Sequence, residues 1–110
     1  MKKLMTFDEL SAFINDYSLK LEEKFGRYDD KEKLILSSTV KLTEELGELC
    51  DEVMTYNSRQ RQEKLDGHSS ENLPHEFADV LLAVFMLAKD MDVDLSQAVK
   101  EKIAKINAKY

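Results

Sequence analysis

The sequence predicts an all-α fold in a single domain, residues 1–110. A chain of 110 residues accommodates one hydrophobic core, since a second core would need roughly fifty residues more. Hydrophobic residues make up 43% of the chain and charged residues 35%, a balance typical of folded globular proteins. With three glycines and one proline, the chain has too few turn residues for an all-β fold. Long helices joined by few turns are therefore expected.

The first helix is expected to begin after Thr6 and to end at Gly26. Thr6 and Glu9 have the spacing of a capping box, in which each side chain accepts a hydrogen bond from the other residue's amide. Gly26 stands where a residue of positive φ commonly closes the last turn. One face at helical spacing is apolar and comprises Phe7, Leu10, Ile14, Tyr17, Leu21 and Phe25.

The second helix is expected to start after Asp29–Asp30 and to run to about Gln60. Ser37–Thr39 either kinks this helix or faces water, and the sequence does not decide between the two. A loop is expected from Asp66 to Asn72, because it holds glycine and a serine pair. The core stripe of this helix comprises Leu42, Leu46, Leu49, Val53 and Tyr56.

The third helix, with Pro74 in its first turn, is apolar around its whole circumference. From residue 77 to 88 every residue except Asp79 is apolar. A helix of this kind must be buried on all sides, and four helices of one short chain can hardly enclose one of their number. We therefore predict an obligate homo-oligomer, a dimer or a tetramer, with this helix at the interface.

The fourth helix is expected to start after Asp94, because Asp94 and Gln97 again have capping-box spacing. A basic stripe of Lys102, Lys105 and Lys109 flanks its apolar face. The residues predicted to be buried on this face are Leu95, Val99, Ile103, Ile106 and Tyr110.

Charge and composition exclude several classes of function. The net charge of −6 argues against nucleic acid as the principal partner. The longest apolar run is far shorter than the roughly 20 residues that span a bilayer, and no signal peptide opens the chain, so no membrane partner is expected. Cys50, the single cysteine, cannot form an internal disulfide and is expected to be a small core residue in a cytoplasmic protein.

Acidic side chains gather beside the apolar faces of the second and third helices. At about 100° per residue, Glu45 and Glu48 lie on one flank of the leucine stripe with Lys41 beside them, whereas Glu44 falls nearly opposite the stripe. Glu76 and Asp79 are three residues apart and share a face of the third helix.

Asp79 is expected to be the most costly of these acids, because it lies deep in the apolar run and a buried, uncompensated carboxylate is unfavourable. A divalent cation such as Mg²⁺, which takes carboxylate oxygens as ligands, would remove that cost. A solvated acidic surface, or an ion pair from Asp79 to a lysine, is the alternative interpretation.

Two motifs together resemble the MazG family of nucleotide pyrophosphohydrolases. Glu-Glu-x-x-Glu at residues 44–48 and Glu-x-x-Asp at residues 76–79 mark that family, and the end of the chain from Asp94 is similar to the last helix of its short members. The resemblance covers about residues 36–110. It implies an all-α, four-helix MazG-like bundle whose core is shared between subunits.

The resemblance also implies Mg²⁺-dependent cleavage of nucleoside triphosphates to monophosphates and pyrophosphate, with Mn²⁺ able to substitute. Glu44 and Glu52 are both candidates for the carboxylate that activates water. Lys102 and Asn107 are the expected substrate contacts, although Asn107 lies one place from the family's asparagine. The implied metal ligands are Glu45, Glu48, Glu76 and Asp79.

Two alternative functions stay open. A phosphoribosyl-ATP pyrophosphohydrolase-like enzyme would use similar acids on a different nucleotide. A non-catalytic helical module for oligomerisation or partner binding would carry the same acids as ordinary surface. The chain contains no tryptophan, so the tryptophan-lined base pocket of the dCTP-hydrolysing members is absent and the substrate base is not predicted.

Overall fold

The computed structural model describes residues 2–66 and 72–110, and of residues 59–66 it describes the backbone. Within these ranges the chain forms four α-helices and no strand, which confirms the predicted all-α class. None of the helices in this part of the chain is both long and apolar enough to cross a lipid bilayer. The helices are α1 (Phe7–Phe25), α2 (Lys31–Asp66), α3 (Leu73–Asp90) and α4 (Leu95–Lys109).

The ends of α1 follow the local sequence as predicted. The Thr6 hydroxyl accepts a hydrogen bond from the Glu9 amide, and the Glu9 carboxylate accepts one from the Thr6 amide, each over 3.1 Å. Gly26 ends the helix with a φ of +86°, which L side chains rarely adopt, and its N–H donates to the Glu22 carbonyl. Both ends of α1 are therefore determined by residues at the ends themselves.

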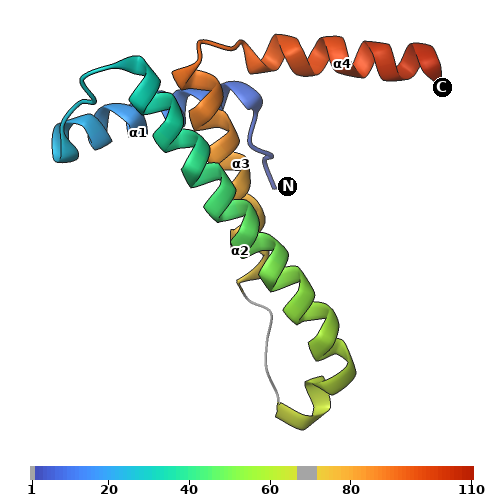
Figure 1. Ribbon diagram of the computed structural model, residues 1–110. Coiled ribbons are helices and arrows are strands. Elements are labelled where there is room, and N and C mark those ends of the chain that lie inside the picture. The colour runs from blue at the N-terminus through green and yellow to red at the C-terminus, as the bar shows by residue number, and fades with distance from the viewer. Residues whose placement is uncertain (1, 67–71) are drawn as a thin grey trace.

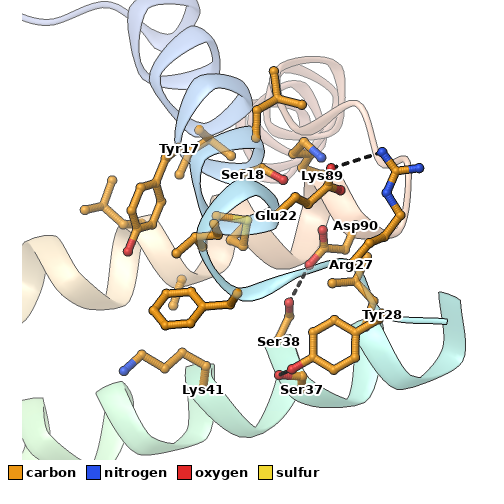
Figure 2. A pocket seen from close by; sticks show the side chains of 18 of the residues that line it. Tyr17, Ser18, Glu22, Arg27, Tyr28, Ser37, Ser38, Lys41, Lys89 and Asp90 are labelled. Atoms are coloured by element: carbon orange, nitrogen blue, oxygen red, sulfur yellow. Dashed lines mark hydrogen bonds and ion pairs between the residues drawn. The ribbon is translucent and has the colours of Figure 1, made fainter. Parts of the chain in front are cut away.

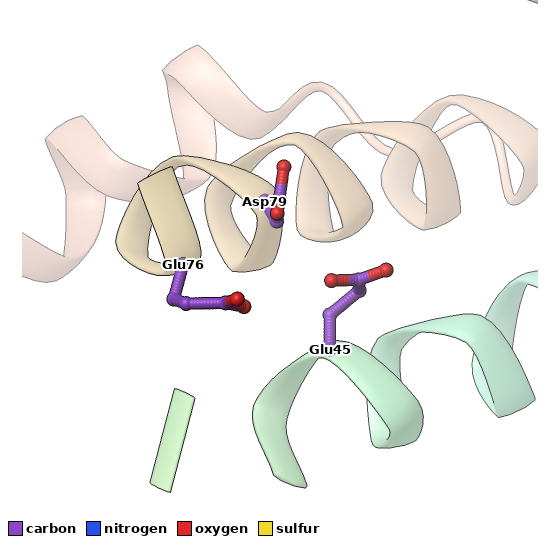
Figure 3. A group of neighbouring side chains, drawn as sticks. All are labelled: Glu45, Glu76 and Asp79. Carbon is purple, nitrogen blue, oxygen red and sulfur yellow. The ribbon is translucent and has the colours of Figure 1, made fainter. Parts of the chain in front are cut away.

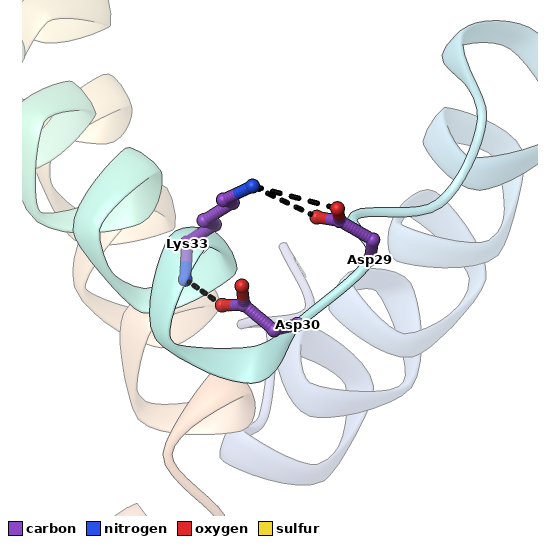
Figure 4. A network of polar contacts seen from close by, with 3 residues as sticks. All are labelled: Asp29, Asp30 and Lys33. Carbon is purple, nitrogen blue, oxygen red and sulfur yellow. Dashed lines mark hydrogen bonds and ion pairs between the residues drawn. The ribbon is translucent and has the colours of Figure 1, made fainter.

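The start of α2 is capped by the acidic pair that precedes it. The Asp30 carboxylate accepts a hydrogen bond from the Lys33 amide over 2.7 Å, and the Lys33 ammonium lies 3.3 Å from an Asp29 oxygen (Figure 4). The helix continues past its predicted end near Gln60 to Asp66. Residues 67–71 of the predicted loop lie outside the described residues.

Ser37–Thr39 does not interrupt α2. The Thr39 hydroxyl donates to the Ile35 carbonyl one turn earlier, which satisfies the side chain within the helix. Ser37 and Ser38 instead bond to residues outside α2, as described below. The predicted kink is therefore absent, and the segment largely faces water, since Ser37 and Thr39 are exposed and Ser38 is half-buried.

The remaining helix starts agree with the prediction. Pro74 lies in the first turn of α3, where its missing N–H breaks no helical hydrogen bond. The Asp94 carboxylate accepts a hydrogen bond from the Gln97 amide over 3.0 Å and so caps α4. The Gln97 side chain donates to Glu101 over 3.1 Å instead of completing the predicted capping box.

The core lies where α1 and α2 pack against α3. α2 and α3 run antiparallel side by side, and α1 crosses the C-terminal half of α3 (Figure 1). The rings of Phe7 and Phe85 are 5.0 Å apart at the α1–α3 contact, and Ile14 and Ala83 are buried. Because α3 is held against α2 along this core, side chains on their facing surfaces meet.

The chain by itself leaves an unusually large surface uncovered. Its accessible surface is 9115 Å², against roughly 6,200 Å² for a compact monomer of this mass. Its radius of gyration is 17.6 Å, against about 13 Å for a compact domain of this length. α4 projects away from the other three helices (Figure 1) and makes little contact with them.

Several residues predicted to be buried are exposed in the single chain. Ile103, Ile106 and Tyr110 on α4 are 52%, 47% and 94% exposed, because no other helix in the described part of the chain covers their face. Cys50, predicted to be a core residue, is exposed as well. α3 is covered by α1 and α2 on one side, so its predicted burial on all sides is not achieved within one chain. Other exposed members of the predicted apolar faces are Phe7, Tyr17, Phe25, Leu46, Phe77 and Leu81.

We expect Thr6→Ala to lower the free energy of unfolding by about 1 kcal/mol, because the helix loses its side-chain cap. Thr6→Ser keeps the hydroxyl and should retain most of that free energy. Urea unfolding of both variants and the parent at equal protein concentration measures the difference. An alanine variant as stable as the parent would contradict the capping role of Thr6.

Candidate metal centre

Three carboxylates from two helices meet between α2 and α3. Glu45 on α2 and Glu76 and Asp79 on α3 each offer an oxygen atom, and these oxygens lie within 4.8 Å of one another. Figure 3 shows the Glu45 side chain rising from α2 toward the two acids of α3. We call Glu45, Glu76 and Asp79 the acidic group.

The helical period explains how these side chains converge. Glu76 lies in the first turn of α3 and Asp79 one turn later, so both project from one side of the helix. Glu45 lies on the flank of α2 that packs beside α3. The pairing of α2 with α3 therefore brings together acids that are more than thirty positions apart in the sequence.

The burial of these acids differs from the prediction. Asp79, predicted to be the buried acid, is exposed, Glu76 is half-buried, and Glu45 is buried. Asp79 lies within the apolar run, but it lines an open cavity beside α2 and so remains exposed. The acid that loses most contact with water in the single chain is therefore Glu45.

The surroundings of Glu76 in the acidic group shift the pKa of its carboxyl. Partial burial raises the pKa of the Glu76 carboxyl above its ordinary value, and the neighbouring negative charges of Glu48, Asp79, Glu45 and Glu52 raise it further. Its Oε2 atom is buried and has no hydrogen-bond partner in the described part of the chain. A buried, repelled and unpartnered carboxylate oxygen is unfavourable until a cation binds it.

Lys41 provides a positive charge at the edge of the acidic group. Its ammonium lies 2.9 Å from Glu45 Oε1, one helical turn away. The hydrogen bond and the charge of Glu45 raise the pKa of the Lys41 ammonium. The Lys41 ammonium offsets one of the three charges of the acidic group, and Glu48 adds a further negative charge nearby. The centre therefore stays strongly negative.

This arrangement fits a hard divalent cation. Such cations take oxygen ligands, mostly carboxylates supplemented by water and substrate phosphates. The acidic group supplies carboxylates from two rigid helices, and the unpartnered Glu76 Oε2 is an available ligand atom. The residues present could therefore hold a metal ion that neutralises their repulsion.

A cavity of about 1220 Å³ opens beside the acidic group, between α1, α2 and α3. Glu45 and Asp79 line one end of it. Aromatic side chains line other parts of the wall, among them Tyr17 and Tyr28 (Figure 2). Ligand pockets for drug-sized molecules measure about 300–1,000 Å³, so a nucleotide fits within this volume.

Polar contacts join several residues of the cavity wall (Figure 2). The Ser38 hydroxyl on α2 donates to the buried Asp90 carboxylate at the end of α3. The Tyr28 hydroxyl donates to Ser37 over 2.8 Å, and the Arg27 guanidinium pairs with Glu22 over 3.2 Å. The cavity thus combines aromatic surface with hydrogen-bonding groups.

Sequence reasoning did not single out Asp90, Ser38 or Arg27 as members of a site. Asp90 offered one signal, because a carboxylate at a helix C-terminus opposes the helix dipole and is unfavourable there without a partner. Ser38 and Asp90 are separated by 52 positions, so helical spacing could not connect them.

The other carboxylates predicted for the site lie around the acidic group. Glu48 is exposed and lies outside the three-residue group. Among the neighbouring carboxylates, its negative charge raises the pKa of Glu76 the most. Glu52 is half-buried, and its charge also reaches Glu76. Glu44 is exposed and lines a separate shallow hollow on α2 with Leu36 and Val40.

The two predicted substrate contacts of α4 are not brought to the acidic group. Lys102 and Asn107 are both exposed, and neither lines the cavity. Both lie on α4, which projects away from the first three helices (Figure 1). In the single chain they lie outside the site.

Comparison with known families agrees with this geometry. Residues 35–110, well over half of the chain, match the MazG nucleotide pyrophosphohydrolase domain. The chain belongs to the MazG family. The MazG match includes all of the acidic group and excludes α1, so it confirms the resemblance inferred from the two acidic motifs. MazG membership indicates a nucleotide pyrophosphohydrolase in general, and no curated protein or solved structure gives a significant match that would narrow this assignment.

We expect Glu76→Gln to raise the melting temperature of the metal-free MazG protein near pH 7. The raised pKa of Glu76 means that ionising this carboxyl disfavours the folded state, an effect absent below the ordinary pKa of 4.5 and present at higher pH. The gain in melting temperature should therefore shrink as the pH falls to about 4. Thermal unfolding at both pH values, with Glu23→Gln as a control outside the acidic group, measures it. An equal gain at both pH values would contradict the electrostatic cause.

Proposed function

We propose that this MazG protein hydrolyses nucleoside triphosphates to nucleoside monophosphates and pyrophosphate, with Mg²⁺ as the metal and Mn²⁺ as a substitute. The observation that most supports this function is the convergence of Glu45, Glu76 and Asp79 within 4.8 Å at the end of a nucleotide-sized cavity. Phosphoryl transfer depends on positioning and charge neutralisation, which an acidic group holding a metal beside a binding cavity can provide.

The proposed metal ligands are the acidic group together with Glu48. Glu48 is exposed, so its side chain can turn toward an ion between α2 and α3 without disturbing the core. Bound Mg²⁺ would neutralise triphosphate oxygens and make the α-phosphorus more electrophilic. The helices contribute by holding the carboxylates at fixed separations before substrate arrives.

We favour Glu52 over Glu44 as the carboxylate that orients and deprotonates the attacking water. Glu52 lies one turn after Glu48, is half-buried, and is close enough for its charge to act on Glu76. Glu44 is exposed, lines the shallow hollow on α2, and does not line the cavity. A general base must lie within hydrogen-bond reach of the water it activates, directly or through one further water.

The nucleoside is proposed to occupy the cavity while the triphosphate lies on the acidic group. Ser38 and Glu45 both line the cavity, and they are seven residues apart, a rise of about 10 Å along α2. This length matches the distance from the phosphates of a nucleotide to its base. The stacked rings of Phe13 and Tyr17, 5.6 Å apart, provide an aromatic surface at the wall. Base and sugar preference would be set by these walls.

A homo-oligomer is proposed because the single chain leaves its apolar faces open. The uncovered apolar residues of α3 and α4 require a partner, and a second copy of the chain offers the same faces. Burying α4 against another subunit would also give Lys102 and Asn107 a neighbouring triphosphate to contact. The core shared between subunits remains part of this proposal.

We expect near-complete loss of pyrophosphate release when any proposed ligand loses its charge. Each of four substitutions keeps the shape of the side chain but removes its charge, so metal binding is weakened and the metal is misplaced. The four are Glu45→Gln, Glu48→Gln, Glu76→Gln and Asp79→Asn. Misplacement by about 1 Å can lower the rate around a hundredfold. Pyrophosphate release from a panel of nucleotides with Mg²⁺ measures the effect, with Glu23→Gln as control.

The same panel tests the alternatives. Turnover of phosphoribosyl-ATP above all nucleoside triphosphates would favour the related pyrophosphohydrolase activity. No turnover, together with no change in melting temperature on adding Mg²⁺, would favour a non-catalytic module. Parent-like rates for both Glu48→Gln and Asp79→Asn would show that the proposed ligand set is wrong. Glu44→Gln should be milder than Glu52→Gln if Glu52 is the base.

We expect light scattering to show a dimer or a tetramer at micromolar concentration. Ile106→Glu should weaken the assembly, because it places a charge in the uncovered apolar face of α4. Ala108→Glu introduces the same charge on the opposite side of α4 and should leave the assembly intact. A folded parent monomer at this concentration would contradict the proposal.

A further inference from the structure

The ion pair between Lys41 and Glu45 joins an exposed ammonium to a buried carboxylate. We propose that Lys41 is a triphosphate-positioning residue: its ammonium neutralises Glu45 before metal binds, and turns to a triphosphate oxygen once a divalent cation holds Glu45. This inference rests on the proposed function, because it assumes that the acidic group binds a metal and a triphosphate. It adds a residue that the acidic motifs did not assign.

The two partners of the ion pair differ greatly in exposure. The Glu45 side chain is 11% exposed and the Lys41 side chain 63% exposed, with Lys41 Nζ 2.9 Å from Glu45 Oε1. Glu45 is held between α2 and α3, whereas a lysine side chain has a long flexible stem and a compact charge. A rearrangement of this pair would therefore move Lys41 and leave Glu45 in place.

A divalent cation and the Lys41 ammonium compete for the same carboxylate. An oxygen of Glu45 lies within 4.8 Å of oxygens of Glu76 and Asp79, so an ion held by all three also faces Lys41. Positive charges at such separations repel each other, and the ion offsets the charge of Glu45 that attracts the lysine. Metal binding thus weakens the ion pair and favours a new partner for the ammonium.

The cavity presents that partner. Lys41 lines the cavity that contains Glu45 and Asp79, so its ammonium can turn into the cavity without leaving the metal centre. A triphosphate oxygen near the ion would be a strong, charge-assisted acceptor within the reach of the lysine. Lys41 would then hold the substrate next to the acids. Lys102 on α4, the lysine predicted for this role, lies away from them within one chain.

The chain offers a matched control on the same helix. Lys33 and Asp29 form an ion pair at the same four-residue spacing, with Lys33 Nζ 3.3 Å from the Asp29 oxygen. Their side chains are 60% and 79% exposed, and neither belongs to the acidic group. Lys33→Met therefore removes a similar charge from α2 without removing a competitor for the metal.

The first measurement is calorimetric titration of Mg²⁺ into the intact oligomer without nucleotide. We expect Lys41→Met to bind Mg²⁺ about two- to fivefold more tightly than the parent, the effect of removing one partly exposed ion pair. Lys41→Arg should bind Mg²⁺ like the parent, and Lys33→Met should show no change. Unchanged or weaker Mg²⁺ binding by Lys41→Met would overturn the proposal, because Lys41 would then merely orient Glu45.

The second measurement uses inorganic tripolyphosphate with Mg²⁺, a probe that needs no knowledge of the preferred base. We expect Lys41→Met to bind it roughly tenfold or more weakly, the loss of one charged hydrogen bond, and Lys41→Arg to retain most of the affinity. Unchanged tripolyphosphate affinity in Lys41→Met would overturn the positioning role.

These outcomes separate the two proposals. A parent protein that binds no Mg²⁺ would overturn the proposed function and the role of Lys41 with it. A parent that binds Mg²⁺ and releases pyrophosphate, while Lys41→Met behaves like Lys33→Met, would overturn the role of Lys41 alone. Circular dichroism of each variant establishes that its helices are intact.

Discussion

Repulsion among carboxylates held together by α2 and α3 is the constraint on which the site depends. Apolar packing around Ala83 and Phe85 keeps α3 in place, and the acidic group has to meet as a consequence. The raised pKa of Glu76 and its unpartnered Oε2 are the local signs of this repulsion. A cation that relieved this repulsion would stabilise the folded chain, so metal binding and stability would be linked.

A second constraint is the apolar surface that the single chain leaves open. The core of α1, α2 and α3 is small, and α4 contributes almost nothing to it. A chain this open is incomplete as a compact unit, which is consistent with a core completed by another copy. Asp79 is exposed on the same helix as the uncovered apolar residues Phe77 and Leu81.

Helix ends and helix faces could be predicted from the sequence because their causes are local. Thr6, Gly26 and Pro74 act within one turn, and the convergence of Glu45 with Glu76 follows from helical periodicity once two helices pair. The burial of Asp79 could not be predicted, because it depends on which side of α3 its neighbours cover. Pairwise contacts between distant segments, such as Ser38 with Asp90, require the tertiary fold itself.

The predicted ligand and substrate residues also differ in whether local helical spacing determines their position. Glu48 and Glu52 lie close enough to Glu76 for their charges to raise its pKa, since they follow Glu45 on α2 by about one and two turns. Lys102 and Asn107 could not be placed, because the position of α4 relative to any site depends on contacts that one chain does not provide.

The central claim is that the acidic group is a metal centre, and the position of the ion tests it most directly. Crystals grown with Mn²⁺ would locate the ion by its anomalous scattering. The account predicts an anomalous peak between α2 and α3, in direct contact with oxygens of Glu45, Glu76 and Asp79. The absence of a peak there, or a peak bound only to other surface carboxylates, would contradict it.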